Sequence, residues 1–488
     1  MAHFRNGNAE AFRFLVQSEI ENFVRQANDR YLHWDKMRFQ RLPDGVPPEF
    51  AWAAVQISRR PQRQELPIRT GGGRLAYWLP PQHQEWVSII DQQAGGFLGG
   101  LRAQTLPDDE DRYLFNSLME EAIASSQLEG ACTTREIGKE LLRTGRRPRN
   151  EAERMILNNY RAILEIREVK KGDLTPALLC HLQSVLTEGT LEKPDAAGRF
   201  RRPDEPITVR DVTTGDVVYT PPSAETVEER VRELCDFANA KSSPFVHPVV
   251  KAMALHFAIG FIHPFVDGNG RTARALFYWY MLKNGYWLFE YLPISRIIVA
   301  APVKYARAYL YTETDDSDLT YFNHYHLKVI IRAINALHDY LADRQRQMAE
   351  VERLLEDYPQ LNHRQKALAW NALKRPAERY TIKEHEGKYH VTYNTARADL
   401  MELAEIGFLT KTKKPGAKEQ VFHPAPGLMK RLKRPVQRIE KGPKAPKPRK
   451  ARKERTTRPP THPKGVSPKQ PSLFDILSEP PAPEPGDD

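Results

Sequence analysis

Apolar residues recur at the three- and four-residue spacing of an amphipathic helix along most of the chain, and alternating runs typical of strands are few. In the first such segment, within residues 10–30, Phe12, Leu15, Ile20, Phe23 and Val24 share one face. The pattern therefore predicts a mostly α-helical fold. Further helices are expected over residues 107–128, 150–170, 174–186, 225–240 and 320–343, with others beginning near His247 and Pro302.

One short stretch departs from the helical pattern. Two β-branched runs, Ile207–Asp211 and Val217–Pro222, are separated by Thr213-Thr214-Gly215-Asp216. Such runs joined by a short polar turn with glycine predict a β-hairpin.

A buried helix is expected over Ala273–Leu282, and the residues just before it and at its start could bind phosphate, bind a metal ion and accept a proton. Residues 268–270 read Gly-Asn-Gly, which tolerate positive φ and could direct backbone N–H groups at an anion. At a helix N-terminus such a nest favours phosphate. Arg271 and Arg274 share the first turn and could bind phosphate oxygens, while Asp267 suits Mg²⁺. His263 is placed to take a proton from an attacking hydroxyl.

Taken together, residues 263–274 resemble the Fic-family signature, His-x-Phe-x-Asp/Glu-Gly-Asn-Gly-Arg-x-x-Arg, at every fixed position. The resemblance implies transfer of AMP from Mg²⁺·ATP to a Ser, Thr or Tyr hydroxyl of a target protein or of the chain itself. It also implies these roles: His263 as general base, Asp267 as Mg²⁺ ligand, Gly268, Asn269 and Gly270 as phosphate cradle, Arg271 on the phosphates and Arg274 on the γ-phosphate. Tyr305 is a candidate for the adenine pocket, with core packing as the alternative.

The same resemblance implies roles for two further segments of the chain. Ser125-x-x-x-Glu129-Gly130 resembles the inhibitory motif that some Fic proteins carry N-terminal to the catalytic core, which would make Glu129 an inhibitor paired with Arg274. The alternative is an ordinary acid near a helix end. The hairpin resembles the flap that pairs with a target segment, through Ile207, Thr208 and Val209; a surface hairpin without a partner is the alternative.

The C-terminal third predicts a winged helix-turn-helix. Helices are expected over residues 364–373, from Thr381, and from Thr392 to about Gly407, followed by a basic hairpin over residues 408–422. The polar start of the third helix could enter a DNA groove. A protein-interaction module is the alternative. The DNA-contact candidates are Tyr393, Asn394, Thr395 and Arg397.

Charge is concentrated in the tail. The net charge of the chain is +11, but residues 430–469 hold 16 Lys/Arg against two acids and so carry +14, which leaves −3 for the rest. The Lys-, Arg- and Pro-rich composition predicts disorder over residues 429–488, ending in an acidic segment. Within it, Gln470–Phe474 resembles the bacterial sliding-clamp binding peptide, with Pro471 in place of the usual leucine.

Cysteine usage and hydropathy restrict the class of protein. Cys132, Cys180 and Cys235 form no CxxC pair, so neither a disulfide framework nor a zinc site is indicated. No run of 18 apolar residues and no apolar leader is present, which predicts a soluble cytoplasmic protein with no membrane partner.

The expected organisation has five parts, and the function has alternatives. An AMP-removing enzyme or another nucleotidyl or phospho-group transferase could use the same motif, with Glu129 orienting water for AMP removal. A DNA-binding regulator with a nucleotide-sensing core is also open, although the intact His263 argues against it. The parts are an accessory region (1–104), a Fic catalytic domain (105–340) with an inhibitory helix (107–130), a linker helix (341–360), a winged helix (361–428) and the tail (429–488).

Overall fold

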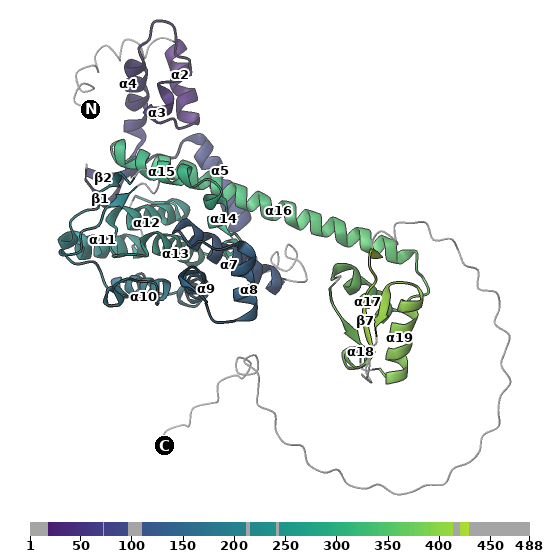
Figure 1. Cartoon of the computed structure of the whole chain (residues 1–488). Helices are drawn as coiled ribbons and strands as arrows, with labels where there is room; N and C mark the ends of the chain where they lie inside the picture. The colour runs from purple at the N-terminus through teal and green to yellow at the C-terminus, as the bar shows by residue number, and fades with distance from the viewer. Residues whose placement is uncertain are drawn as a thin grey trace, which may run out of the picture. The chain divides into compact units, whose positions relative to one another are not determined.

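The structure is a computed structural model, and it describes residues 18–71, 73–95, 110–210, 215–240, 244–375, 377–389, 391–412 and 420–428. The chain divides into two compact units, Met1–Lys366 and Ala367–Asp488. The prediction of a mostly α-helical fold is confirmed (Figure 1). Within the described residues, no helix combines the length and apolar character needed to cross a membrane.

The first half of unit 1 holds helices and one hairpin. Its helices are α2 (Ser18–Asp29), α3 (Trp34–Met37), α4 (Pro48–Arg59), α5 (Pro81–Ala94), α7 (Glu110–Leu128), α8 (Arg135–Thr144), α9 (Glu151–Val169) and α10 (Pro176–Thr187), with 3₁₀ turns at Arg60–Gln62 and Pro194–Ala196. Strands β1 (Gln64–Thr70) and β2 (Gly73–Tyr77) pair antiparallel.

The second half of unit 1 carries the site. It contains β3 (Val209–Arg210), β4 (Val217–Tyr219), α11 (Val227–Asn239), α12 (Pro248–Ile262), α13 (Asn269–Lys283), α14 (Ile294–Val299), α15 (Pro302–Thr314) and α16 (Thr320–Glu356), with 3₁₀ turns at Ala224–Thr226 and Trp287–Glu290. Residues 1–17, 96–109 and 211–214, which include parts of the expected first helix, inhibitory helix and hairpin, lie outside the described residues.

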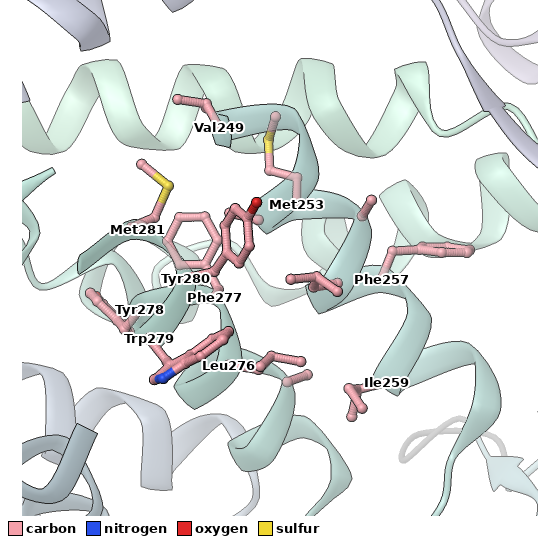
Figure 2. Close-up of a cluster of buried hydrophobic side chains, with 14 of the residues drawn as sticks. Val249, Met253, Phe257, Ile259, Leu276, Phe277, Tyr278, Trp279, Tyr280 and Met281 are labelled. Atoms are coloured by element: carbon pink, nitrogen blue, oxygen red, sulfur yellow. The ribbon is translucent and has the colours of Figure 1, made fainter. Parts of the chain in front are cut away.

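Helices α12 and α13 form the centre of unit 1 because they are apolar on nearly every face, a pattern that requires burial all round. They pack against each other, and α9, α10, α11 and α16 contact one or both of them. Figure 2 shows Met253 of α12 near Phe277 and Tyr280 of α13. Phe257 is 1% exposed and Trp279 is 0% exposed. The loop between these helices is therefore held at both ends by the core.

The N-terminal region packs onto the rest of unit 1 through buried polar contacts. Tyr31 Oη donates to Asp318 Oδ2 at 2.5 Å, and Arg63 Nη2 lies 2.8 Å from the same carboxylate oxygen. Arg59 Nη1 donates to Tyr321 Oη at 2.8 Å. Because Asp318 is fully buried, removing any of its partners would leave part of its charge uncompensated.

The helix expected over residues 320–343 is longer than predicted, because α16 runs without a break over 37 residues and includes most of the segment expected as a linker helix. Its sequence contains no glycine or proline that would interrupt it.

Unit 2 contains helices and a small sheet. The chain here forms α17 (His363–Lys374), β5 (Tyr380–Thr381), α18 (Ile382–Tyr389), α19 (Tyr393–Glu405), β6 (Leu409–Thr412) and β7 (Val421–Pro424). The strands are antiparallel in the order β5-β7-β6. Thr392 caps α19, since its side chain accepts a hydrogen bond from the backbone of Thr395.

Several predicted features of the C-terminal part lie outside the described residues. Residues 413–419, which hold most of the lysines expected at the wing tip, are not described, nor is the basic tail with Gln470–Phe474. On α19, Tyr393, Asn394 and Arg397 are exposed and Thr395 is half-buried. Their contact with DNA stays a prediction.

Candidate active site

His263 ends helix α12 in the left-handed backbone conformation, with φ 51° and ψ 58°. Its Nδ1 lies 3.1 Å from the carbonyl oxygen of Gly260. Since a carbonyl can only accept, Nδ1 carries the proton and Nε2 keeps a lone pair. Burial lowers the pKa of His263, although the Gly260 contact opposes this. The imidazole is thus a neutral base near pH 7.

Arg201 holds the backbone of His263, and sequence reasoning gave it no role. Its Nε donates to the His263 carbonyl at 2.8 Å, and its Nη2 donates to the carbonyl of Pro222, just after the hairpin. Its backbone N–H donates to the carbonyl of Pro264 at 2.9 Å. Burial lowers the pKa of Arg201. The only sequence signal was its place in Gly198-Arg199-Phe200-Arg201, which does not separate a buried arginine from an exposed one.

The loop after His263 is fixed by Phe265 and Asn269. Phe265 is 0% exposed. The Asn269 side chain accepts from the Phe265 N–H at 2.9 Å and donates to the Phe265 carbonyl at 2.8 Å. Gln183 of α10 adds a bond from Nε2 to the Asp267 carbonyl at 3.1 Å. The Asn269 side chain therefore shapes the loop from within.

The two glycines of the loop serve different purposes. Gly268 is the N-cap of α13 with φ 84°, so it needs the left-handed region. Gly270 belongs to the first turn of the helix and needs space: a Cβ there would lie 2.2 Å from Glu129 Oε1. The expected run of positive-φ residues is thus limited to Gly268, and the anion site is the first turn of α13.

Asp267 and Arg271 lie at the edge of this turn. The Asp267 side chain is 51% exposed, with Oδ2 2.9 Å from Arg271 Nη2. Arg271 is almost fully buried and also donates to the Leu186 carbonyl at 3.0 Å. Among the described residues, no group of three or more His, Cys, Asp or Glu could hold a metal ion. A single exposed carboxylate fits Mg²⁺ that takes its other oxygens from phosphates and water.

Glu129 lies over the anion site and pairs with Arg274. Arg274 Nη1 lies 3.0 Å from Glu129 Oε1. The guanidinium also donates from Nε to Ser125 Oγ and from Nη2 to the Ser125 carbonyl, both at 2.9 Å. Burial would lower the pKa of Arg274, but the Glu129 carboxylate outweighs burial and raises it. The ion pair expected from the sequence is present.

Helix α7, which ends one residue before Glu129, is anchored by a second acid. Glu121 is buried and accepts a hydrogen bond from the Ser295 N–H at 2.8 Å, at the start of α14. Burial raises the pKa of Glu121, although bonds from Ser295 and Tyr278 oppose this. Ser117 on the same helix donates to the Tyr291 carbonyl at 2.6 Å. These contacts fix the position from which Glu129 reaches Arg274.

Tyr305 lies beside Arg274 at the start of α15. Its hydroxyl is 2.8 Å from His256 Nε2. Burial raises the pKa of Tyr305, while Arg274 lowers it. Its ring contacts those of Tyr309 and Tyr325. These contacts suit a core residue, and an adenine contact stays a prediction.

The expected hairpin is present next to this site. Strands β3 and β4 pair antiparallel, with Val209 opposite Tyr219, and Ile207 and Thr208 precede β3. Val217 is 47% exposed and Val218 is 45% exposed. Tyr219 Oη donates to the Phe261 carbonyl at 2.8 Å, two residues before His263. The hairpin is thus tied to the end of α12.

Known proteins resemble this part of the chain. Residues 173–281 match the Fic/DOC family. "Protein adenylyltransferase fic-1" of Caenorhabditis elegans is 34% identical over 85 residues, which is 17% of this chain and 17% of that protein. "Protein adenylyltransferase Fic" of Nematostella vectensis is 33% identical over 93 residues, 19% of this chain and 20% of that protein.

The match covers a small part of each protein, since this chain spans a fifth or less of the length of these relatives. A crystal structure of a Fic family protein from Desulfovibrio desulfuricans G20 superposes with a TM-score of 0.47 and 19% identity, covering 70% of this chain and 94% of that one. The matched residues include α12, the loop after it and α13 as far as Met281, and these elements carry the residues of the candidate site. Residues 173–281 of this chain are thus similar to the Fic/DOC family.

Proposed function

We propose that the protein is an adenylyltransferase that moves AMP from Mg²⁺·ATP to a Ser, Thr or Tyr hydroxyl of a protein. The observation that carries the proposal is a neutral, half-buried His263 held beside the N-terminus of α13, with Arg274 on the same helix. A base and an anion site a few residues apart fit a proton-dependent transfer from a polyphosphate. Two relatives named protein adenylyltransferase are 34% and 33% identical to this chain over 85 and 93 residues.

The proposed reaction is a direct displacement. The target hydroxyl oxygen bonds to the α-phosphorus, and the bond from that phosphorus to the oxygen bridging the β-phosphate breaks. Pyrophosphate leaves with the bonding electrons, and the hydroxyl proton moves to His263 Nε2. The first turn of α13, with Gly268, Asn269 and Gly270, binds phosphate oxygens. Positioning and charge stabilisation supply the remaining rate enhancement.

The cationic groups have separate parts in this proposal. Arg271 orients Asp267 through their 2.9 Å contact and adds positive charge at the phosphates. Asp267 holds Mg²⁺, which neutralises charge on the phosphates when it is bound. Arg274 binds the γ-phosphate once Glu129 releases it. Tyr305 lies at the start of α15, where it would border the adenine.

Glu129 is proposed to inhibit the enzyme. Its carboxylate occupies the space above Gly270 and engages Arg274. A γ-phosphate would meet a like charge there and would be displaced. The α-phosphorus would then lie away from the line of attack. Release of Glu129 is expected to allow productive binding.

The test is incubation of the purified chain with each α-³²P-labelled nucleoside triphosphate, Mg²⁺ and a cell lysate. Labelled protein bands that appear with ATP, increase in Glu129→Gly and vanish in His263→Ala support the proposal. Faster labelling from another nucleoside triphosphate would identify that nucleotide, and not ATP, as the donor. A parallel incubation with γ-³²P-ATP should leave the proteins unlabelled, and labelled bands in it at the expected positions would contradict AMP transfer.

Hydrolytic removal of AMP is the second candidate, because a carboxylate lies directly at the anion site. Glu129, 27% exposed, could orient water toward the phosphorus of an AMP-modified side chain. In that case Glu129→Gly would lose removal of AMP from a modified protein without gaining transfer. Release of AMP from a pre-labelled lysate measures this directly.

Unit 2 is proposed to be a winged helix that binds DNA through α19. The exposed Tyr393, Asn394 and Arg397 at its start support this, with Thr395 beside them. The tail would add salt-dependent, sequence-independent affinity, and Gln470–Phe474 would bind a sliding clamp. Comparing DNA and clamp binding of the full chain with a chain ending at Leu432 separates the tail from α19.

A further inference from the structure

A cavity outside the candidate active site is lined by residues of the hairpin strand β4 and of the elements around it. Its volume is about 610 Å³. One wall is strand β4 and the residues after it, and the others come from α11, α12, α15 and the turn after β1. Phe257 and Phe261 of α12 and Leu310 of α15 give it apolar surface. The proposed function uses none of these three side chains.

Glu313 is the notable polar group of this cavity. It lies in the last turn of α15, where the helix dipole disfavours a negative charge. Burial raises the pKa of Glu313 to about 7. Within the described part of the chain, no hydrogen bond or ion pair compensates its carboxylate. A half-buried acid without a partner is costly, so its presence beside an open cavity calls for an external partner.

The other charges around the cavity do not neutralise Glu313. Arg230 of α11 donates from Nη1 to the Arg69 carbonyl at 2.8 Å and from Nε to Thr226 Oγ1 at 3.1 Å. Asp316 pairs with Arg60 at 3.0 Å. Arg230, which lines the cavity, is therefore hydrogen-bonded to neutral oxygens, and within the described residues it forms no ion pair with Glu313.

The cavity is connected to the proposed reaction by its walls. Tyr219 of β4 lines it and donates its hydroxyl to the Phe261 carbonyl, and Phe261 precedes the base His263 by two residues. Burial raises the pKa of Tyr219 far above its ordinary value, so this hydroxyl stays a donor. A segment lying along β4 would therefore place one side chain over the cavity while another approaches His263.

The lining selects a class of side chain. An apolar side chain would fill the space between the phenylalanines but would further desolvate Glu313 without compensating it. Lysine and arginine combine an apolar stem with a cationic end, which matches apolar walls with one carboxylate. A charge-assisted hydrogen bond to that carboxylate is stronger than a neutral one.

We propose that this cavity binds a lysine or arginine side chain of the target protein, with its cationic group against Glu313 and its methylenes against Phe257, Phe261 and Leu310. The inference rests on the proposed function, and it assumes that the target segment lies along β4 and not along the opposite strand with Ile207, Thr208 and Val209, the residues that the resemblance implies. It makes Glu313 a specificity residue that selects basic residues near the modified hydroxyl. Glu313 has no part in the chemical step.

The first experiment needs no catalysis. Agmatine, which is 4-aminobutylguanidine and carries a guanidinium and an ammonium group joined by four methylenes, is titrated into the full-length protein and followed by calorimetry. Wild type should bind it, and Glu313→Gln should bind it about tenfold or more weakly, as expected for loss of a charge-assisted bond. Because the cation favours the ionised carboxylate, affinity should be higher at pH 8 than at pH 6. Equal affinity of wild type and Glu313→Gln would overturn the assignment.

Two controls accompany the titration. Glu225→Gln removes an exposed acid that does not line the cavity, and it should bind agmatine as wild type does. Phe257→Leu keeps the carboxylate while altering the apolar wall, and it should weaken binding by a smaller factor than Glu313→Gln. If Glu225→Gln weakens binding as much as Glu313→Gln, the effect is general surface charge and the proposal fails.

The second experiment tests selection of the target. Capped peptides with one Ser, Thr or Tyr and a single arginine at successive positions are offered with labelled ATP to Glu129→Gly, with and without Glu313→Gln. One position of arginine should raise labelling, and Glu313→Gln should abolish that preference. If the labelling rate does not depend on the position of the arginine, the inference is overturned while the proposed function stands. Absence of labelling from every peptide and from lysate proteins would contradict the proposed function, and agmatine alone would then decide whether the cavity is a cation site.

Discussion

Replacing Glu129 by glycine is the perturbation that the site defines most sharply. The Glu129 carboxylate is the group against Gly270 in the first turn of α13, and Arg274 reaches it at 3.0 Å. The variant empties the space above the helix N-terminus and leaves Arg274 bonded to Ser125. Gly130, the next residue, already has φ 91°, so a glycine before it adds backbone freedom at the helix end.

The magnitude follows from the environment of the pair. Arg274 is 3% exposed and Glu129 is 27% exposed, so the pair lies between a surface pair and a buried one. Surface pairs contribute about 0–1 kcal/mol, and breaking buried pairs costs about 3–5 kcal/mol. A loss of about 2 kcal/mol in unfolding free energy is expected, because the Ser125 bonds remain. Mg²⁺·ATP should restore stability by supplying the missing negative charge.

The effect on transfer should be larger than the effect on stability. A displaced γ-phosphate shifts the α-phosphorus from the line of attack, and misplacement of about 1 Å can cost on the order of 100-fold in rate. Glu129→Gly should therefore raise AMP transfer by about that factor at saturating Mg²⁺·ATP. Glu129→Asp should raise it less, because a shorter carboxylate still opposes the phosphate.

The assay is the initial rate of label transfer from α-³²P-ATP to protein, with nucleotide affinity measured separately by calorimetry. Glu136→Gly is the matched control, since Glu136 is an exposed acid in the first turn of α8 and has no contact with Arg274. It should leave the rate unchanged. Equal rates for wild type and Glu129→Gly would refute inhibition by Glu129. Equal activation by Glu136→Gly would show that loosening of the region, and not release of Arg274, is the cause.

Three further outcomes are expected. His263→Ala should lower transfer by about 10²- to 10⁴-fold while calorimetry shows nucleotide still bound, because the base is separate from the phosphate contacts; substantial transfer would contradict its role. Arg201→Lys should lower kcat with little change in KM for ATP, because a single ammonium group cannot bond both the His263 and the Pro222 carbonyls as the guanidinium does. The control Arg202→Lys changes an exposed neighbour and should leave both kinetic constants unchanged. For Glu313, the folded pKa of about 7 lies above the ordinary 4.5, so its contribution to stability is present below pH 4.5 and lost as pH rises through 7. Urea unfolding should show Glu313→Gln gaining up to about 3 kcal/mol over wild type between pH 4.5 and pH 8, and a pH-independent difference would contradict this pKa.

The sequence by itself determined the helical character of the chain and the chemistry of the loop. Helix α13 was predicted because its residues are apolar at every spacing, and the structure begins it at Asn269. The Glu129–Arg274 contact was expected from the resemblance of Ser125-x-x-x-Glu129-Gly130 to an inhibitory motif, since Glu129 by its chemistry alone is an ordinary acid near a helix end. Local periodicity and local residue order carried the predictions of the helix and the loop, and both can be read without knowing the tertiary structure.

Tertiary packing decided which distant atoms meet. Arg201 is 62 residues from His263 and bonds to its carbonyl, and Glu313 gains its raised pKa only because β4 and α12 enclose it. Packing also decided that Gly270 is needed for space and that the Asn269 side chain shapes the loop from within. Burial and hydrogen-bond partners are properties of the assembled core, and a residue's type and spacing cannot reveal them because the same arginine or glutamate can be exposed in one fold and buried in another.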